Sequence, residues 1–290
     1  GCAQCCRAAA PQIRGADNPA VWLAPVFPSI FPFPRSVPLP KGCAIMDNYE
    51  FCVQWVLDKG RTDPIRVLDY GCGAGEIVKL LRARDIEAFG CDVYYDAADY
   101  SNTMDPALFG TLLRKMEDGR IPFADSAFDF VINNQVMEHV ENLDAVLAEI
   151  SRVLKPGGLV LSLFPDKRVW REGHSGIPFF HWFPKGSRFR VYYALVLRTL
   201  GLGYFKEGKP RKKWSEDYCI WLDKWTYYRS RKEIRETFAK HFAELKHIEV
   251  YWLHKRLGAR RVIAAWLPAA IQRYVVWKLA GLVLEARKAF

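Results

Sequence analysis

Residues 65–81 read IRVLDYGCGAGEIVKLL, and this stretch decides the fold. The apolar, β-branched run before Asp69 is typical of a buried strand, and the apolar spacing from Glu76 to Leu81 predicts a helix. Three glycines form the turn between them: Gly71, Gly73 and Gly75. Because glycine has no Cβ, the backbone N–H groups of such a turn can approach a ligand, and the helix that follows places this ligand at a positive dipole end. The stretch therefore predicts a ligand-binding loop between a strand and a helix.

The spacing of these glycines separates three kinds of loop. A dinucleotide fingerprint needs a third glycine where this chain has Glu76, and a triphosphate-binding P-loop needs a Gly-Lys-Ser/Thr ending that does not follow. The remaining pattern, an acidic residue and then G-x-G-x-G, resembles the first motif of the class I S-adenosylmethionine-dependent methyltransferases. In that family the loop holds the methionine part of S-adenosyl-L-methionine. The resemblance implies that five residues contact this cofactor: Asp69, Gly71, Cys72, Gly73 and Gly75.

An acidic residue at the end of the next expected strand points to the same cofactor. A short apolar segment ends in Asp92, about twenty residues after the glycine loop. In doubly wound sheets a carboxylate at this position accepts hydrogen bonds from ribose hydroxyls. We therefore expect Asp92, with its neighbour Val93, to contact the ribose. Residues 99–117 then follow with the apolar spacing of a helix.

The following segment makes the resemblance more specific. Phe128–Ile132 is a continuous apolar run, as expected of a central parallel strand. The polar strand end at Asn133 and the sequence Glu-His-Val that starts at Glu138, on an expected helix, resemble the type 11 small-molecule group of class I methyltransferases. So do a further helix, the tight turn at residues 155–158 and a fifth strand after it. Together these matches cover residues 65–164.

The resemblance implies an α/β fold with a doubly wound, mostly parallel, seven-stranded Rossmann-like sheet and a helical, aromatic and basic insertion after the fifth strand. Four parts are expected: a Pro- and Ala-rich leader at 1–45, a cofactor-binding core at 46–165, an insertion or substrate lid at 166–243, and terminal strands with a connecting helical segment at 244–290. Proline at the density of the leader prevents a helix or a central strand, and it interrupts the apolar core that a secretory signal needs. Helical spacing resumes at Met46, which is a candidate start of the natural protein.

The resemblance also implies roles for later residues. The turn Asp118-Gly119 would lie at the adenine edge, and Asn133 would lie beside the methionine and the transferred methyl group. His139, expected on the helix after Asn133, is the nearest candidate for a base that takes a proton from a hydroxyl acceptor, and a structural hydrogen bond is the alternative role. The candidate acceptor contacts are Gln135, His174 and His181. No metal ligands are expected.

The net charge of +10 comes from one part of the chain. Residues 166–261 hold 23 Lys and Arg against 10 Asp and Glu. A nucleic acid, an acidic substrate, an anionic membrane surface and an ordinary solvated face each explain such a segment. The eight cysteines are scattered, and the CxxC sequence at Cys2 and Cys5 has no partner pair. We therefore expect a reducing, cytoplasmic compartment and no zinc site.

Aromatic residues are interleaved with the basic ones after Asp166. Regular patterns follow in order, with helices over 191–202 and 227–242 and strands over 246–253 and 280–287. The aromatic residues suit a core or a ligand platform, and the insertion leaves from the sheet edge at which α/β folds bind substrates. Residues 260–278 are too short and too charged to span a bilayer. They either pack on the domain or lie peripherally on the inner face of an anionic membrane.

We predict a methyltransferase that moves the methyl group of S-adenosyl-L-methionine by in-line displacement to a small polar or lipid-linked acceptor, such as a sugar or metabolite oxygen. The fourth strand ends in Asn133-Asn-Gln-Val, not in the Asn-Pro-Pro-Tyr of the family's nucleobase- and glutamine-methylating members, so no nucleic acid partner is expected. Two alternatives stay open. One is an RNA or protein methyltransferase that uses the basic insertion, and the other is an inactive cofactor-binding subunit that serves a partner.

Overall fold

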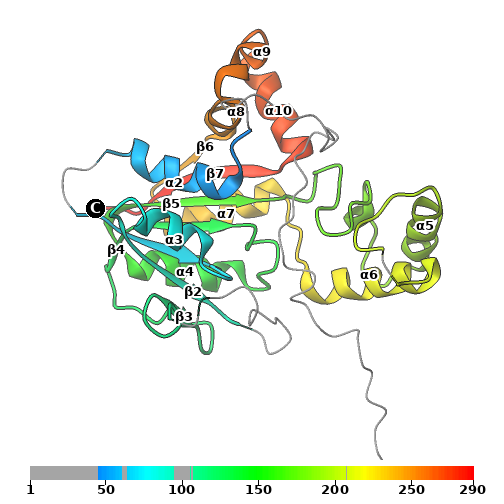
Figure 1. Ribbon diagram of the computed structural model, residues 1–290, viewed down its shortest axis with the longest axis horizontal. Helices are drawn as coiled ribbons and strands as arrows, with labels where there is room; N and C mark the ends of the chain where they lie inside the picture. Colours follow the sequence, from blue (N-terminus) through cyan, green and yellow to red (C-terminus); the bar gives the residue numbers. More distant parts are fainter. Residues whose placement is uncertain (1–44, 61–63, 95–104, 106, 207) are drawn as a thin grey trace, which may run out of the picture.

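The chain folds around one twisted sheet with helices on both faces (Figure 1). The computed structural model describes residues 45–60, 64–94, 105, 107–206 and 208–290. The expected leader, except for its last residue, lies outside the described residues, and so does most of the first half of the helix expected at 99–117. Within the described part of the chain, no helix is both long enough and apolar enough to cross a bilayer.

The sheet has seven strands in the order β3-β2-β1-β4-β5-β7-β6. The strands are β1 (Arg66–Tyr70), β2 (Glu87–Asp92), β3 (Leu113–Lys115), β4 (Phe128–Asn134), β5 (Leu154–Phe164), β6 (Glu244–His247) and β7 (Leu282–Arg287). The first five run parallel, and β7 runs antiparallel to both of its neighbours, β5 and β6. The predicted fold class is therefore confirmed. Because the chain moves outward from β1 in both directions, the loops after β1 and β4 diverge and leave a binding site at the carboxyl ends of these strands.

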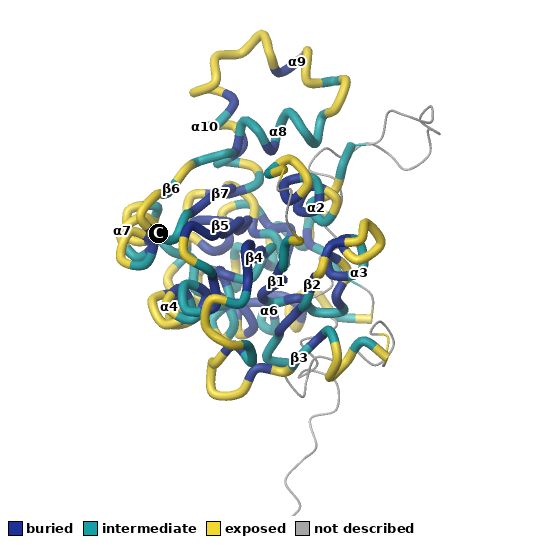
Figure 2. The backbone as a smooth tube through the Cα atoms, turned by 90° about the vertical axis from the view of Figure 1, so that its left-hand side faces the viewer, coloured by how far each residue is buried: buried dark blue, intermediate teal, exposed yellow. Residues whose placement is uncertain are grey.

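Helices cover the sheet in two layers. They are α2 (Asn48–Asp58), α3 (Glu76–Arg82), α4 (Leu143–Val153), α5 (Arg188–Thr199), α6 (Arg211–Trp225), α7 (Arg231–His241), α8 (Glu249–Leu257), α9 (Arg261–Ala265) and α10 (Ala269–Leu279), with short 3-10 turns η1 (Phe180–Trp182) and η2 (Gly258–Arg260). Alternate strand residues pack into two separate cores, so that Val67 faces α2 and α3 whereas Leu68 faces α4 and α7. Figure 2 shows the strands as the buried centre of the molecule.

The insertion after β5 has a core of its own. Helices α5 and α6 pack on each other to one side of the sheet (Figure 1), and Trp214, Tyr218 and Phe180 are fully buried between them and η1. Helix α7 instead lies against α4 and belongs to the layer that covers the sheet. The end of the insertion at residue 243 stays a prediction, since one of its helices is part of the core.

Two expected elements were wrong. Residues 107–112 form turns and not a helix, because Leu113 is buried at the start of β3 and pairs with Gly90 of β2. The strand expected at 246–253 ends at His247, and α8 begins at Glu249. The buried Glu249 carboxylate fixes this start, since it accepts hydrogen bonds from the Trp277 indole at 2.8 Å and from His247 Nδ1 at 2.9 Å.

The turn expected at residues 155–158 is part of β5. The register shifts there, since Phe128 pairs with Leu154 but Phe130 pairs with Leu159, and Gly157 has φ of 72°. The reversal is therefore present as an irregularity inside the strand. The terminal antiparallel pair, β6 and β7, completes the sheet as predicted.

Candidate functional site

The glycine loop lies at the carboxyl end of β1 and is packed too tightly for larger residues. Gly71, Gly73 and Gly75 have φ of 77°, 49° and 77°, the left-handed region that favours glycine. A Cβ at Gly71 would lie 2.4 Å from Cγ2 of Val136, which follows β4. The Cys72 side chain is buried beneath the loop, and its backbone is paired as well: its N–H donates to the Cys91 carbonyl at 3.2 Å, and its carbonyl accepts the Gly75 N–H at 2.8 Å.

Asp92 joins the end of β2 to this loop. Its Oδ2 accepts the Gly73 N–H at 2.9 Å, and its Oδ1 accepts the Val93 N–H at 2.7 Å. Burial raises the pKa of Asp92, although these backbone donors partly offset the effect. Each carboxylate oxygen has two lone pairs, so capacity remains for a ligand hydroxyl. The ribose role of Asp92 and Val93 stays a prediction.

Tyr94 covers the loop from the side of β2, and sequence reasoning missed it. Its hydroxyl donates to the Gly73 carbonyl at 3.2 Å and lies 3.3 Å from the Cys72 sulfur. Its ring meets Phe109 edge-on with centroids 5.4 Å apart. The only available signal was an aromatic residue two positions after the strand-end acid.

Asp69 is a buried carboxyl group at the end of β1. Burial and the nearby charge of Asp92 raise the pKa of Asp69 to about 8. The side chain is therefore protonated in part near neutral pH, and a bound cation would favour its ionised form. This behaviour suits a site for a positively charged ligand group.

The end of β4 contributes an amide that is held inside the sheet. Asn133 is fully buried, and its Nδ2 donates to Ser162 Oγ on β5 at 2.8 Å. Among the described residues, its Oδ1 has no hydrogen-bond partner. Gln135 follows in the left-handed conformation, and its backbone N–H donates to the Leu163 carbonyl at 2.7 Å. These contacts hold the start of the β4–α4 turn beside the glycine loop.

The turn Asp118-Gly119 lies after β3, toward the edge of the sheet. Both residues have positive φ and are exposed, and the Arg120 N–H donates to the Glu117 carbonyl across the turn at 2.9 Å. The predicted turn is present, and its adenine role stays a prediction.

His139 lies in the turn between β4 and α4, so its expected place on a helix was wrong. Tertiary contacts hold this turn, because the His139 Nδ1 is 2.7 Å from the Trp225 carbonyl and the Tyr227 N–H donates to the Glu138 carbonyl at 2.7 Å. Burial lowers the pKa of His139 to about 3, so the ring is neutral. Its Nδ1–H donates to Trp225, which leaves the Nε2 lone pair available.

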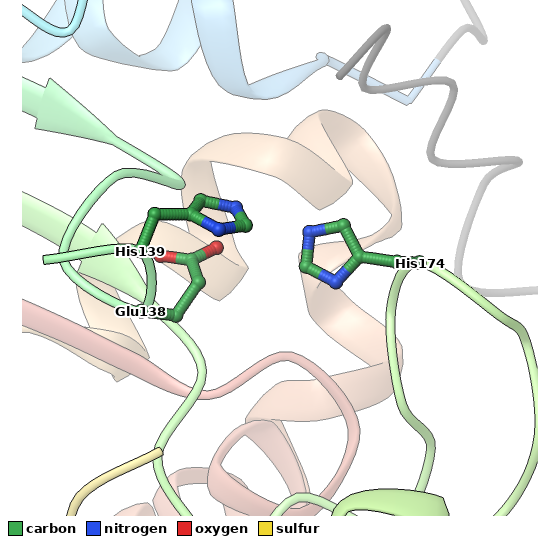
Figure 3. A group of neighbouring side chains, drawn as sticks. All are labelled: Glu138, His139 and His174. Carbon is green, nitrogen blue, oxygen red and sulfur yellow. The ribbon is translucent and has the colours of Figure 1, made fainter. Parts of the chain in front are cut away.

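His174 comes from the insertion and faces His139, with ring centroids 4.9 Å apart (Figure 3). Its Nδ1 lies 2.7 Å from Glu172, whose fully buried carboxylate also accepts the Tyr228 hydroxyl at 2.7 Å and the Ser175 N–H at 2.6 Å. Burial opposes a charged imidazole, but the Glu172 carboxylate outweighs it and raises the pKa of His174.

The third acceptor candidate, His181, also comes from the insertion and lies in η1. It stacks on the Tyr228 ring with centroids 4.4 Å apart, and burial lowers its pKa to about 4. Tyr228 therefore bridges His181 to the carboxylate that holds His174. Sequence reasoning missed Glu172 and Tyr228, because no local pattern relates these two residues.

A guanidinium group ties the insertion to the β4–α4 turn. Arg229 donates to the carbonyls of Val140 and Glu141, each at 2.6 Å, and to that of Met137 at 3.3 Å. These hydrogen bonds hold the insertion against the β4–α4 turn at the place where His139 and His174 meet.

Comparison with known proteins gives a family match and individual relatives. The profile of a family described as a methyltransferase domain matches residues 68–162. Over 117 residues the chain is 30% identical to a malonyl-(acyl-carrier protein) O-methyltransferase of Methylococcus capsulatus, which covers 37% of this chain and 42% of that protein. Over 103 residues it is 38% identical to sterol 24-C-methyltransferase erg6 of Schizosaccharomyces pombe, which covers 32% of this chain and 26% of that protein.

A solved structure of an S-adenosylmethionine dependent methyltransferase from Mesorhizobium loti aligns with 83% of this chain and 100% of its own, at a TM-score of 0.47 and 12% identity. The chain spans less than half the length of the curated relatives it matches first.

Proposed function

We propose that this chain is a class I S-adenosylmethionine-dependent methyltransferase and that it transfers a methyl group from S-adenosylmethionine to a small polar or lipid-linked acceptor. The methyltransferase-domain match over residues 68–162 supports this proposal. The observation that carries this proposal is the hydrogen bond from the Gly73 N–H to the Asp92 carboxylate, which joins the end of β2 to the glycine loop. A carboxylate beside backbone donors suits a ribose and an amino-acid tail, whereas it would repel a phosphate. When bound, the cofactor supplies an activated methyl group and a thioether leaving group.

The residues around the loop fit this cofactor in size and charge. The Val136 side chain fills the space beside Gly71, so only glycine fits at this point of the loop. Asp69 and Asp92 place two carboxyl groups beside a molecule that is positive at its ammonium and sulfonium groups. We propose that Asp69 serves the methionine end, Asp92 the ribose, and the Asp118-Gly119 turn the adenine. Asn133, through its unpaired Oδ1, would then lie on the methyl side.

The acceptor is proposed to bind between the β4–α4 turn and the insertion, where His139 and His174 face each other. With its Nδ1 proton held by Trp225, His139 presents Nε2 to a hydroxyl and orients that oxygen toward the methyl group. Orientation supplies much of the rate in a displacement with a good leaving group. Gln135, at the start of the same turn, is a further candidate contact to the acceptor.

A lipid-linked acceptor is supported by the surface of α9 and α10, here called the α9–α10 face. Its exposed apolar residues are Val262, Trp266, Leu267, Ile271, Tyr274, Val275 and Leu279. Trp266 is 89% exposed, and Arg261 and Lys278 lie on the same helices. Figures 1 and 2 show that α8, α9 and α10 project together from the sheet. An anionic membrane surface offers partners to both the apolar and the basic residues.

Ion pairing weakens the argument from the basic insertion to a polynucleotide acceptor. Some of its cations pair with acids of the same segment, for example Lys213 with Asp217 at 2.8 Å and Arg231 with Asp166 at 2.6 Å, although cations remain in excess. Such pairing lowers the positive potential that phosphate binding requires.

The proposed function is tested in two steps. Titration calorimetry with S-adenosylhomocysteine is expected to give one site on the full chain. A tritium-labelled methyl donor is then incubated with the protein and a cell extract that is separated into lipid, metabolite, RNA and protein pools, and label is expected in the lipid or metabolite pool. Label in RNA or protein contradicts the acceptor class, binding without label favours the inactive subunit, and absence of cofactor binding overturns the proposal.

A further inference from the structure

Three metal-binding side chains meet at the seam between the β4–α4 turn and the insertion. Glu138, His139 and His174 each offer one ligand atom, and these atoms lie within 4.8 Å of one another (Figure 3). Two imidazoles and one carboxylate are a ligand set that borderline divalent ions such as Zn²⁺ bind well. His139 and Glu138 are neighbours in the chain, whereas His174 comes from a different part of the fold.

Both imidazoles are oriented as metal ligands usually are. In metal sites the second ring nitrogen of a ligating histidine donates its proton to a carboxylate or a backbone carbonyl. Here the Nδ1 of His174 lies 2.7 Å from the Glu172 carboxylate, and the Nδ1 of His139 lies 2.7 Å from the Trp225 carbonyl. Each contact fixes the tautomer that leaves the Nε2 lone pair available.

Glu138 lacks the partners that a buried carboxylate needs. It is 1% exposed, and neither of its side-chain oxygens has a hydrogen-bond partner among the described residues. A buried polar group without a partner costs free energy, so such groups usually pair with a donor or coordinate an ion. His139 and His174 are only partly buried, which leaves an approach to the cluster from one side.

We propose that Glu138, His139 and His174 bind one divalent transition-metal ion of the Zn²⁺ type, through one carboxylate oxygen and two Nε2 atoms. Three protein ligands leave a fourth position open, as in catalytic and not in structural zinc sites. The Glu172 carboxylate and the Trp225 carbonyl would orient His174 and His139, respectively, without binding the ion. The site departs from the absence of metal ligands that the sequence alone predicted.

The open position gives the ion a substrate role, in which the acceptor oxygen binds the ion and does not contact His139 Nε2 directly. This role rests on the proposed methyl transfer, whereas ion binding does not. The cluster belongs to the turn whose Val136 lies against Gly71, so an acceptor oxygen bound there would sit on the methyl side of the cofactor. A metal ion both orients such an oxygen and makes its proton easier to lose. The acceptor class that fits is a hydroxyl or carboxylate oxygen and not an amine.

The test uses the full chain after treatment with a chelator. Titration with Zn²⁺ by calorimetry is expected to show one equivalent bound, and Co²⁺ is expected to give the visible absorption of a low-symmetry, four- or five-coordinate site. Glu138→Gln and His174→Ala are expected to abolish both signals. Glu172→Gln is expected to keep the stoichiometry and weaken affinity by about 10–100-fold, since it loosens His174 without removing a ligand.

Three controls separate the possible outcomes. His241→Ala removes a histidine outside the cluster and is expected to bind one equivalent, and circular dichroism checks that every variant is folded. A Cys2→Ser, Cys5→Ser, Cys6→Ser variant is expected to bind as the parent does. No bound metal, or binding that survives Glu138→Gln and His174→Ala, overturns the proposal. S-adenosylhomocysteine binding is measured on the same samples, so loss of the cofactor and loss of the metal are distinguished.

Discussion

The carboxylate of Asp92 accepts a hydrogen bond from the backbone N–H of Gly73 at 2.9 Å, so the end of the second strand holds the loop that follows the first. This contact makes one residue responsible both for the shape of the loop and for the proposed ribose site. Its removal therefore has consequences beyond a single hydrogen bond.

We expect Asp92→Ala to weaken S-adenosylhomocysteine binding by more than about tenfold, or about 1.4 kcal/mol, because ribose hydroxyls and the Gly73 N–H lose their acceptor. Calorimetry measures the effect. Asp92→Asn is the matched control, since its amide oxygen can still accept from Gly73 while the charge is lost, and an intermediate affinity is expected. Unchanged affinity in Asp92→Ala would refute the ribose assignment.

Gly71→Ala is expected to destabilise the fold by about 2–4 kcal/mol, because the new Cβ is strained at positive φ and lies 2.4 Å from Val136. Gly119→Ala is the control for strain alone, with about 1–2 kcal/mol, since no heavy atom lies within 4 Å of its added Cβ. Urea unfolding gives both values. Val136→Ala in the Gly71→Ala background should recover part of the loss, and failure to do so would show that the contact is not the cause.

The pH dependence of stability is expected to reveal Asp69. Its pKa in the fold is about 8, above its ordinary value of 3.8, so the group stabilises the fold most below the ordinary value and loses that contribution as the pH rises toward 8. The free energy of unfolding of the cofactor-free protein should therefore fall across this window, and Asp69→Asn should flatten the slope. Equal slopes in the two proteins would contradict the burial of this carboxyl group.

Cofactor binding gives a second readout of Asp69. A cationic ligand favours the carboxylate, so S-adenosylmethionine is expected to release a proton on binding near pH 7. Calorimetry in two buffers of different ionisation enthalpy measures this release. It should diminish in Asp69→Asn, and an undiminished proton release in that variant would assign the proton to another group.

Arg229→Ala is expected to cost about 1–3 kcal/mol of stability, because carbonyls of the turn at residues 137–141 lose their donor. Hydrogen exchange in the turn and in residues 225–228 should rise more than exchange in the β-sheet core. Arg235→Ala, an exposed arginine on α7, should change stability by less than about 0.5 kcal/mol. A uniform rise in hydrogen exchange across the sheet would contradict a role of Arg229 that is confined to the turn and the insertion.

The α9–α10 face is expected to bind anionic vesicles. A Trp266→Ala, Ile271→Ala variant should lose most of this binding, because the exposed apolar side chains that would enter the interface are removed. Phe189→Ala removes an aromatic residue outside the α9–α10 face, 78% exposed on α5, and should have little effect. Flotation with anionic and with zwitterionic vesicles at low and high salt checks this, and equal binding by all three proteins would exclude the face.

The elements around the glycine loop could largely be predicted, because the sequence patterns that mark them are local. The glycine spacing after Asp69 and the acid at Asp92 each follow from a strand and the turn that directly continues it. The order of these elements then predicted the parallel sheet, and the confirmed topology follows from that order.

The sequence did not predict the elements and side-chain groups that depend on contacts between residues far apart in the chain. The short strand β3 exists because Leu113 packs beside Gly90, and apolar spacing alone could not distinguish it from a helix. The start of α8 depends on the burial of Glu249 against Trp277. The histidine cluster joins His139 to a residue of the insertion, and its supporting carboxylate, Glu172, has no motif at all.

The turn after β4 contacts the glycine loop with one residue and the insertion with others. Val136 fills the space beside Gly71, and Glu138 and His139, two and three residues later, meet the insertion. A shift of the insertion when the acceptor binds would thus be transmitted to the glycine loop, the proposed site of the methyl donor. By thermodynamic reciprocity, whatever factor the acceptor adds to the affinity for the donor, the donor adds to the affinity for the acceptor. Where this factor exceeds one, the ternary complex is favoured over either half-filled state.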